Sequence, residues 1–415
     1  MSKPLKITKN NKNIIGEISL DGSKSISNRV LIIRALCSEK FDIKGLSTSD
    51  DTKAMQRALA EKKAVVDVGA AGTTMRFLTA FFATCPNKTV VLTGSERMKQ
   101  RPIGVLIDAL RTLGADIDYL ENENCPPLSI KGKQLEGGEI EIDASVSSQY
   151  LSALLMIAPT LKRGLKLHLK GEMVSKPYLE MTLKIMHYFG IAYEWSGNTI
   201  DIKSQKYQAK AYVVEADWSA ASYYYAMAAY SEKLNIHLKG LYNQGIQGDS
   251  VLATFMQQFG IETTYFEDGI RLRKSNVALP KFFEYDFVNC PDIAQTLAVV
   301  CAGLKINGTF RGLSTLSIKE TDRTAALQAE LAKYDCHFFG ENDVWHLEAQ
   351  KFNDERLNSI ATYHDHRMAM SFAPLAMQLK QGLIIENHKV VTKSYPKFWQ
   401  DIEQFEFYNE CITNS

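Results

Sequence analysis

The chain has 415 residues, of which 45% are hydrophobic and 23% are charged, a composition typical of a globular protein with more than one domain. Its 48 Lys and Arg residues nearly balance its 47 Asp and Glu residues, so the formal net charge is +1. A dedicated nucleic-acid-binding protein normally has a marked basic excess, so we expect no nucleic-acid partner. The apolar runs are far shorter than the roughly 20 residues of a membrane helix, so we also expect no membrane association.

The cysteines indicate a reducing compartment. There are seven, scattered at positions 37, 85, 125, 290, 301, 336 and 411, and no Cys-x-x-Cys pair occurs. An odd number without regular spacing argues against a disulfide framework and against a zinc ribbon. The N-terminal segment lacks the apolar core of a secretory signal. We therefore expect a cytoplasmic protein with reduced thiols, and, because no partner motif stands out, a monomer.

Polar or glycine residues open apolar, helix-like runs at nearly constant spacing. The intervals are 47, 75, 70, 75 and 72 residues, and the six positions are Ser25, Gly72, Ser147, Asp217, Asp292 and His364. A second series marks helix C-termini before short strands, at intervals of 76, 70 and 75 residues, at Gly114, Gly190, Gly260 and Asp335. Any α/β protein can begin and end its helices with such residues, which is the alternative explanation of these positions. The regular spacing instead favours six βαβαββ-like units, three per domain, with the first unit shortened.

Cations gather at several of these helix starts. Lys24 and Arg29 follow a strand-like run and open a helix, and Lys319 and Arg323 open another. Cations at a helix N-terminus oppose the helix dipole, so their placement indicates an anionic ligand. The first segment lacks the spacing of a Walker A loop.

A metal site has to be considered at the start of the last apolar run. His364 and His366 lie two residues apart with an Asp between them. No third ligand with a suitable spacing follows, so we expect no metal.

Taken together and in order, the motifs resemble the 5-enolpyruvylshikimate-3-phosphate synthases, the enolpyruvyl transferases of the shikimate pathway. The likeness spans residues 22–393, nearly the whole chain. Its eight motifs are Gly22-Ser-Lys-Ser with Ser27-Asn-Arg29, Ala71-Gly-Thr, Arg101-Pro-Ile-Gly, Ser147-Ser-Gln, Ser175-Lys-Pro-Tyr, Pro291-Asp, Lys319-Glu-Thr-Asp-Arg and Asp365-His-Arg-Met-Ala-Met.

This resemblance implies a two-domain inverse α/β barrel. One domain would contain residues 1–20 and 217–415, the other residues 21–216, and the active-site cleft would lie between them. The implied reaction transfers the enolpyruvyl group of phosphoenolpyruvate (PEP) to the 5-hydroxyl of shikimate 3-phosphate and releases phosphate, with no cofactor.

The resemblance also implies which residues bind the two substrates. For shikimate 3-phosphate they are Lys24, Ser25, Arg29, Ser147, Ser148, Gln149, Ser175, Tyr178, Asp292, Thr315 and Lys319. For PEP they are Lys24, Gly72, Arg101, Gln149, Arg323, Arg367 and Lys393. The substrates together carry about five negative charges, which suits a concentration of cations in a chain of net charge +1.

Three residues are candidates for proton transfer. Asp292 is the favoured acceptor of the hydroxyl proton. Lys24 and Glu320 are candidates for protonating C3 of PEP and for removing a proton during elimination, and the motifs leave open which residue does which.

The chain departs from the family pattern in places. The stretch 51–69 is shorter than usual, which matches the short first interval. Thr315 and Ala70 stand where the family often has Asn, and Phe77 stands where it often has Pro. Gly72 is retained, so we expect the family's inhibitor glyphosate to fit the PEP pocket.

Two alternatives stay open. The sister enzyme that acts on UDP-N-acetylglucosamine shares the fold, but usually carries a Cys in the loop before the Arg-Pro pair, and the loop 95–101 has none. A non-catalytic anion-binding protein would need the cleft without its acids, whereas Asp292 and Glu320 are both present.

Overall fold

The computed structural model of the protein describes residues 3–61, 63–145, 147–171, 173–243 and 245–412. The chain folds into two compact units. The discontinuous unit contains the chain up to Asp21 and again from Glu215 onward, and the inserted unit spans Gly22–Val214.

The described part of the inserted unit contains three sheets. In spatial order, the first consists of β4 (Val65–Asp67), β5 (Thr89–Thr93), β7 (Leu128–Lys131) and β6 (Asp116–Tyr119). The second consists of β10 (Glu194–Ser196), β11 (Thr199–Ile202), β9 (Leu165–Lys170) and β8 (Gly138–Asp143). The third pairs β12 (Tyr212–Val213) with β3 (Ile43–Lys44). The α-helices are α1 (Lys24–Leu36), α2 (Asp50–Ala60), α3 (Gly72–Ala83), α4 (Gly104–Thr112), α5 (Ser148–Ile157) and α6 (Lys176–Tyr188).

The described part of the discontinuous unit contains three four-stranded sheets. In spatial order, the first consists of β14 (Ile261–Tyr265), β15 (Gly269–Lys274), β13 (Lys233–Lys239) and β2 (Asn13–Ser19). The second consists of β16 (Phe282–Asp286), β17 (Asn307–Arg311), β19 (Val344–Glu348) and β18 (His337–Glu341). The third consists of β20 (Ser359–Ile360), β21 (Leu383–Ile385), β1 (Leu5–Thr8) and β22 (Tyr408–Cys411). The α-helices are α7 (Trp218–Tyr230), α8 (Leu252–Phe255), α9 (Ala294–Gly303), α10 (Arg323–Ala332), α11 (His366–Phe372) and α12 (Phe398–Glu403).

The sheets repeat one topology. In β4-β5-β7-β6, the strands β4 and β5 are parallel and joined through α3, and β7 and β6 continue the sheet antiparallel. Every other four-stranded sheet likewise has one parallel pair followed by two antiparallel pairings. The sheet of β12 and β3 has only the parallel pair. The prediction of βαβαββ-like units with a shortened first unit is therefore confirmed.

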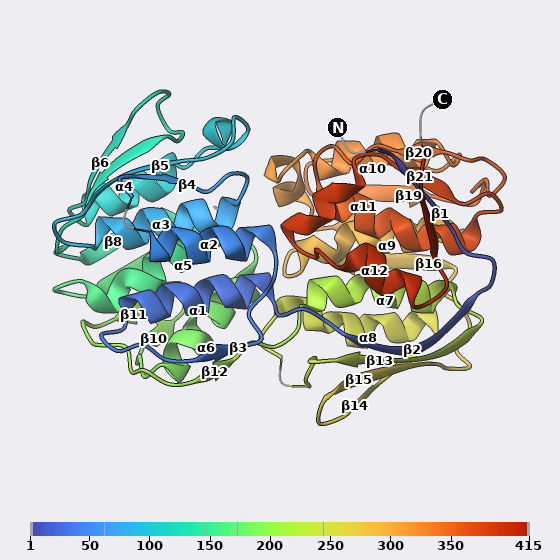
Figure 1. The fold of residues 1–415 in the computed structure, drawn as a ribbon, viewed down its shortest axis with the longest axis horizontal. Helices are drawn as coiled ribbons and strands as arrows, with labels where there is room; N and C mark the ends of the chain where they lie inside the picture. Colours follow the sequence, from blue (N-terminus) through green and yellow to red (C-terminus); the bar gives the residue numbers. More distant parts are fainter. Residues whose placement is uncertain (1–2, 62, 146, 172, 244, 413–415) are drawn as a thin grey trace. The chain divides into compact units, whose positions relative to one another are not determined.

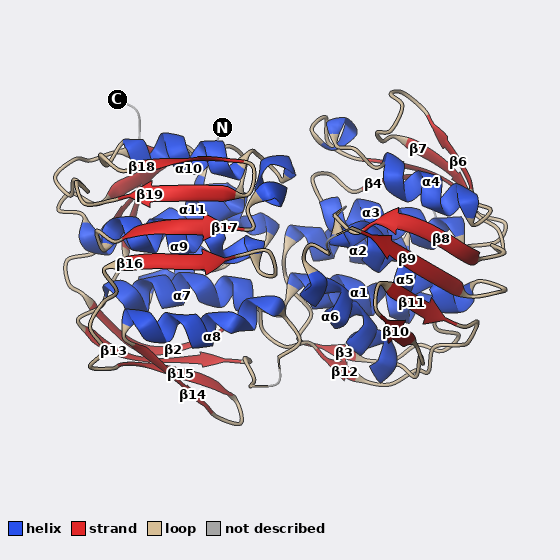
Figure 2. Ribbon diagram, turned by 180° about the vertical axis from the view of Figure 1, so that it is seen from behind, coloured by secondary structure: helices blue, strands red, loops and turns tan. Residues whose placement is uncertain are grey.

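Within each unit the helices lie inside and the sheets outside, as in an inverse barrel. All ten residues of α9 are buried, as are twelve of α7, and helices that are apolar all round belong in a core. The strands β16, β17, β19 and β18 cover α9 and α10 in the discontinuous unit (Figure 2). In the inserted unit α1, α2 and α3 pack side by side (Figure 1).

The helices begin and end close to the positions expected from the sequence, with small shifts. Left-handed backbone follows the expected helices at Gly114 (φ 102°), Gly190 (86°), Gly260 (70°) and Asp335 (58°). The last helix start is displaced, because its N-cap is Asp365 rather than His364. His364 itself has a left-handed backbone (φ 58°) and cannot begin the helix. None of the described helices has the length and apolar composition that crossing a bilayer requires.

Candidate active site

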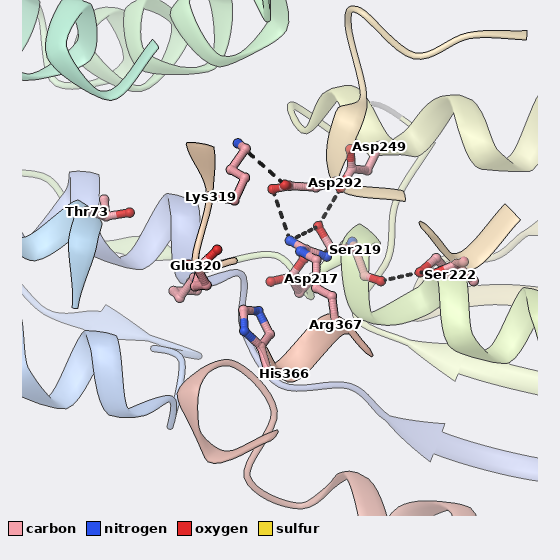
Figure 3. Close-up of polar contacts among 12 residues, drawn as sticks. Thr73, Asp217, Ser219, Ser222, Asp249, Asp292, Lys319, Glu320, His366 and Arg367 are labelled. Carbon is pink, nitrogen blue, oxygen red and sulfur yellow. Dashed lines mark hydrogen bonds and ion pairs between the residues drawn. The ribbon is translucent and has the colours of Figure 1, made fainter. Parts of the chain in front are cut away.

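In the discontinuous unit, the carboxylate of Asp292 faces three cations, two of which, Lys319 and Arg367, are labelled in Figure 3. Asp292 lies in the 3₁₀ helix Pro291–Ile293, just before α9. Its Oδ1 is 3.0 Å from Nη1 of Arg323 and 3.7 Å from Nζ of Lys319, and its Oδ2 is 3.0 Å from Nη2 of Arg367. Burial by itself would raise the pKa of Asp292, but the three cations outweigh it and hold that pKa well below its usual range. Asp292 is therefore ionised at neutral pH.

Arg323, the first residue of α10, binds three carboxylates at once. Its Nε donates to Oδ2 of Asp365 at 2.7 Å, its Nη1 to Asp292 at 3.0 Å, and its Nη2 to Oε2 of Glu320 at 2.9 Å. Glu320 also accepts a hydrogen bond from Nζ of Lys393 at 2.7 Å. Burial lowers the pKa of Arg323, but the carboxylates outweigh burial and raise it above its ordinary value. Six of the residues expected at the site thus belong to one ion-pair network.

Asp365 connects this network to α11. It is completely buried, and its Oδ1 accepts the backbone N–H of Arg367 at 2.8 Å, so the same side chain binds Arg323 and caps the helix that carries Arg367. His364 is exposed, whereas His366 is buried at the first position of the helix. Among the described residues there is no group of three His, Cys, Asp or Glu side chains that could hold a metal ion.

The sequence analysis missed one buried carboxyl group at this site, Asp249. Nη2 of Arg367 donates to Oγ of Ser219 at 3.5 Å, and Ser219 donates to Oδ2 of Asp249 (Figure 3). Burial, assisted by repulsion from Asp292, raises the pKa of Asp249 to about 7. Its other oxygen, Oδ1, is buried without a hydrogen-bond partner among the described residues. Nothing in its local motif, a Gly-Asp pair, signals this role.

Lys319 and Thr315 differ in their surroundings. Burial lowers the pKa of Lys319, although Asp292 opposes the shift. Thr315 lies in the 3₁₀ helix Ser314–Ile318, and its buried hydroxyl has no hydrogen-bond partner among the described residues. The ion-pair network therefore includes Lys319 but not Thr315.

In the inserted unit, a buried guanidinium is held by neutral groups. Arg29 donates from Nε to Thr182 at 2.7 Å, from Nη2 to Ser152 at 2.9 Å and from Nη1 to the carbonyl of Ser25 at 2.9 Å. Its guanidinium carbon lies 5.3 Å from the ring centre of Phe77, one of the residues that depart from the family pattern. Burial lowers the pKa of Arg29 to about 10, so Arg29 stays charged at neutral pH. Such a cation suits an anionic ligand.

A second cationic group surrounds the start of α3. An added Cβ at Gly72 would lie 2.6 Å from Nη1 of Arg101 and 3.1 Å from Nη1 of Arg76, so a side chain there would displace the guanidinium group of Arg101 from its present position. The guanidinium group of Arg101 has no hydrogen-bond or ion-pair partner among the described residues. The first turn of α3 contains no acidic residue and no side-chain cap. Free N–H groups and an unneutralised arginine together form an anion-binding environment.

The catalytic candidate Lys24 has a counterion that the sequence analysis did not select. Its Nζ is 3.6 Å from Oδ2 of Asp51, and both side chains are largely buried. Asp51 is the second of two adjacent aspartates in the first turn of α2. In the sequence, this pattern indicates only acidic residues that interact favourably with the helix dipole.

The starts of α5 and α6 hold the remaining expected residues. Gln149 donates to Oγ1 of Thr73 at 3.1 Å, and Ser147 caps α5 by accepting from the N–H of Gln149 at 3.4 Å. Ser175 has a left-handed backbone (φ 57°), and its hydroxyl makes no cap hydrogen bond. Tyr178 lies one turn further along α6 and interacts electrostatically with Arg29. Both helix starts therefore carry polar side chains and backbone N–H groups of the kind that can bind an anion.

The fold is that of the enolpyruvyl transferases. It superposes on EPSP synthase from Acinetobacter baumannii with a TM-score of 0.81 at 20% identity, covering 99% of this chain and 100% of that one. It also superposes on the enolpyruvyl transferase NikO from Streptomyces tendae with a TM-score of 0.76 at 12% identity, covering 100% of both chains. At these identities the likeness establishes the fold alone.

Sequence comparison identifies the particular family. The family model described as EPSP synthase (3-phosphoshikimate 1-carboxyvinyltransferase) matches residues 8–61 and 55–402. A 3-phosphoshikimate 1-carboxyvinyltransferase of Bacteroides fragilis is 47% identical over 392 residues, which cover 94% of this chain and 95% of that protein. One from Haemophilus influenzae is 36% identical, covering 96% and 97%. The chain belongs to the EPSP synthase family.

Proposed function

We propose that this protein transfers the enolpyruvyl group of PEP to the 5-hydroxyl of shikimate 3-phosphate and releases phosphate. Membership of the family supports this function. The structural observation that carries it is the environment of Arg323, which joins two partly exposed carboxylates, Asp292 and Glu320, within one cluster of cations. The cations suit anionic substrates, and the carboxylates suit the proton transfers that enolpyruvyl transfer requires.

The two substrates would be bound by different, partly overlapping sets of residues. PEP would be bound by the unneutralised Arg101 beside Gly72 and by Arg323, Arg367 and Lys393, with Gln149 and Lys24 completing the site. Shikimate 3-phosphate would be bound by Lys24, Ser25, Arg29, Ser147, Ser148, Gln149, Ser175, Tyr178, Asp292, Thr315 and Lys319. Each charge-assisted hydrogen bond to such a group contributes about 1.5–3 kcal/mol.

The reaction would proceed by addition and elimination. Asp292 accepts the proton of the 5-hydroxyl while the oxygen attacks C2 of PEP and C3 is protonated, which gives a tetrahedral intermediate. Loss of a proton from C3 then expels phosphate and restores the double bond. General acid–base catalysis of this kind contributes about 10²–10⁴-fold per step.

The ion pairs support one division of the two transfers at C3. Lys24 pairs as a cation with Asp51 and would donate a proton. Glu320 pairs as an anion with Arg323 and Lys393 and would accept one. We therefore assign C3 protonation to Lys24 and C3 deprotonation to Glu320. This assignment requires the two domains that the resemblance implies, residues 1–20 with 217–415 and residues 21–216, to close around one pair of substrates.

The test is phosphate release by the purified protein, supplied with PEP, with and without shikimate 3-phosphate, and with no metal added. Release that requires both substrates supports the proposal. Release with UDP-N-acetylglucosamine instead would assign the sister reaction. No release with either acceptor, together with binding of PEP, would leave an anion-binding protein.

We also propose that the protein acts as a monomer in the cytoplasm. The scattered cysteines without Cys-x-x-Cys pairs support a reducing compartment. Light scattering of the eluting protein tests the oligomeric state, because a dimer would double the 46.6 kDa mass of the chain.

A further inference from the structure

The turn before α11 has an unusual backbone. Tyr363 (φ 51°) and His364 (φ 58°) are two successive non-glycine residues in the left-handed region. This conformation is uncommon for residues other than glycine, and it is a genuine outlier for a bulky side chain. The turn leads directly into Asp365, which binds Arg323 and caps the helix of Arg367. Its surroundings must therefore hold the turn in place.

Glu330 makes the hydrogen bonds that hold this turn in place. It is 1% exposed, and its Oε1 accepts the hydroxyl of Tyr363 at 2.8 Å while its Oε2 accepts the backbone N–H of Ala361 at 3.2 Å. Lys333 donates to Oε2 of Glu330 at 2.7 Å and to the carbonyl of Ser359 at 2.7 Å. The buried charge is thus paired, and each of the two carboxylate oxygens fixes one point of the segment that enters the turn.

Glu330 and Arg323 act from the same helix. They are seven residues apart on α10, which places them on one face, two turns and about 10.5 Å along the axis from each other. Arg323 binds Asp365 after the turn, and Glu330 binds Ala361 and Tyr363 before and within it. Helix α10 therefore binds the chain both before and after the left-handed residues of the turn.

We propose that Glu330 and Tyr363 are positioning residues, which hold the turn at residues 363–364 so that Asp365 in turn places Arg323 and Arg367 to bind the anionic groups of PEP. This inference rests on the proposed function, because it names PEP as the anion. Glu330 itself lies among protein groups and would act only through the turn. A purely structural ion pair between Glu330 and Lys333 is the competing explanation.

Tyr363→Phe separates the two explanations, because it removes one hydroxyl from a partly exposed ring. We expect the KM for PEP to rise about tenfold, as expected for an arginine that no longer makes a well-aligned charge-assisted contact. The KM for shikimate 3-phosphate should stay within twofold. Glu330→Gln should act in the same direction and more strongly, since it removes the charge that both contacts use.

A rescue variant tests the role of the strain. Glycine adopts a left-handed backbone without a tether, so His364→Gly introduced into Tyr363→Phe should recover at least half of the lost affinity for PEP. The matched control is Tyr230→Phe, which also removes a single phenol hydroxyl, in this case a buried one bonded to the carbonyl of Val299 at 2.7 Å. It should lower the melting temperature but leave both KM values unchanged.

The outcomes are distinguishable. An unchanged KM for PEP in Tyr363→Phe, an equal rise in both KM values, or a rescue variant no better than its parent would overturn the positioning role. A wild-type protein without turnover would instead overturn the proposed function. In that case the rise in melting temperature on adding PEP tests the positioning role. A smaller rise in Tyr363→Phe than in Tyr230→Phe supports this role. Equal rises in the two variants, or no rise in either, overturn it.

Discussion

Asp292→Asn is the substitution that tests the chemistry of the site most directly. The carboxylate of Asp292 lies 3.0 Å from both Arg323 and Arg367, so it has two roles that oppose each other. It is the proposed base, and it also occupies the cations that PEP would use. The amide variant keeps the shape, cannot accept the hydroxyl proton and no longer competes with the substrate for the two arginines.

The two roles predict opposite changes in kcat and in affinity. Loss of general base catalysis should lower kcat by about 10²–10⁴-fold. A pair of unit charges about 4 Å apart near a protein surface interacts by about 4 kcal/mol, and part of this competition is relieved in the variant. PEP should therefore bind at least as tightly to the variant as to the wild type, and up to about tenfold more tightly.

The pH dependence gives an independent check. Three cations outweigh burial and hold the pKa of Asp292 well below its usual range in the unliganded protein. Bound anions draw those cations away, so the pKa of Asp292 rises in the complex. Because kcat/KM reports the free enzyme and kcat the complex, the acid limb of kcat should lie at a higher pH than that of kcat/KM.

Steady-state phosphate release and PEP binding by calorimetry measure both quantities. Normal turnover by Asp292→Asn would refute the base assignment. A fall in kcat accompanied by a parallel loss of PEP affinity would show that Asp292 only organises the arginines, and the reasoning from competition would then be wrong.

Three further substitutions follow from the same geometry. Asp365→Asn leaves one donor of the buried Arg323 without its carboxylate, and should lower the free energy of unfolding in urea by about 3 kcal/mol; an unchanged value would contradict the network. Burial raises the pKa of Asp249 to about 7, so the fold retains a proton that the unfolded chain releases near pH 4, and stability is lost as pH rises between these values. Asp249→Asn should therefore stabilise the protein above pH 7, by up to about 4 kcal/mol, with no gain below pH 4, and a gain at acidic pH would contradict this. In Gly72→Ala the new Cβ would lie 2.6 Å from Nη1 of Arg101, so the KM for PEP should rise about tenfold or more with little change in melting temperature, and an unaltered KM would contradict the role of that arginine.

The family resemblance, rather than local patterns alone, pointed to the residues of the network in the discontinuous unit, and some of them also lie at helix starts. Asp292 precedes α9, and Arg323 begins α10, so a cation or an acid at each start is visible in the sequence. The shortened first repeat was also predictable, since the missing strand pair shortens the interval before Gly72.

Other parts of the site depend on tertiary contacts that leave no local signature. The raised pKa of Asp249 comes from burial and from the charge of Asp292, which is distant in sequence. The contact between Glu330 and Tyr363 spans 33 residues. The same limit explains the displaced helix start, because the residue type of His364 does not by itself specify the left-handed backbone observed there.

The exposures of the three carboxylates around Arg323 indicate which ion pairs change when substrate binds. Asp365 is 0% exposed, whereas Asp292 and Glu320 are 19% and 17% exposed. Solvent reaches the last two but not the first, so under the proposed function only Asp292 and Glu320 could meet the substrates. Asp365 can therefore remain bound to Arg323 throughout the reaction, while the anionic groups of the substrates replace Asp292 and Glu320. Each carboxylate so displaced loses a cation and becomes a stronger base, so substrate binding itself activates the two groups proposed to accept protons.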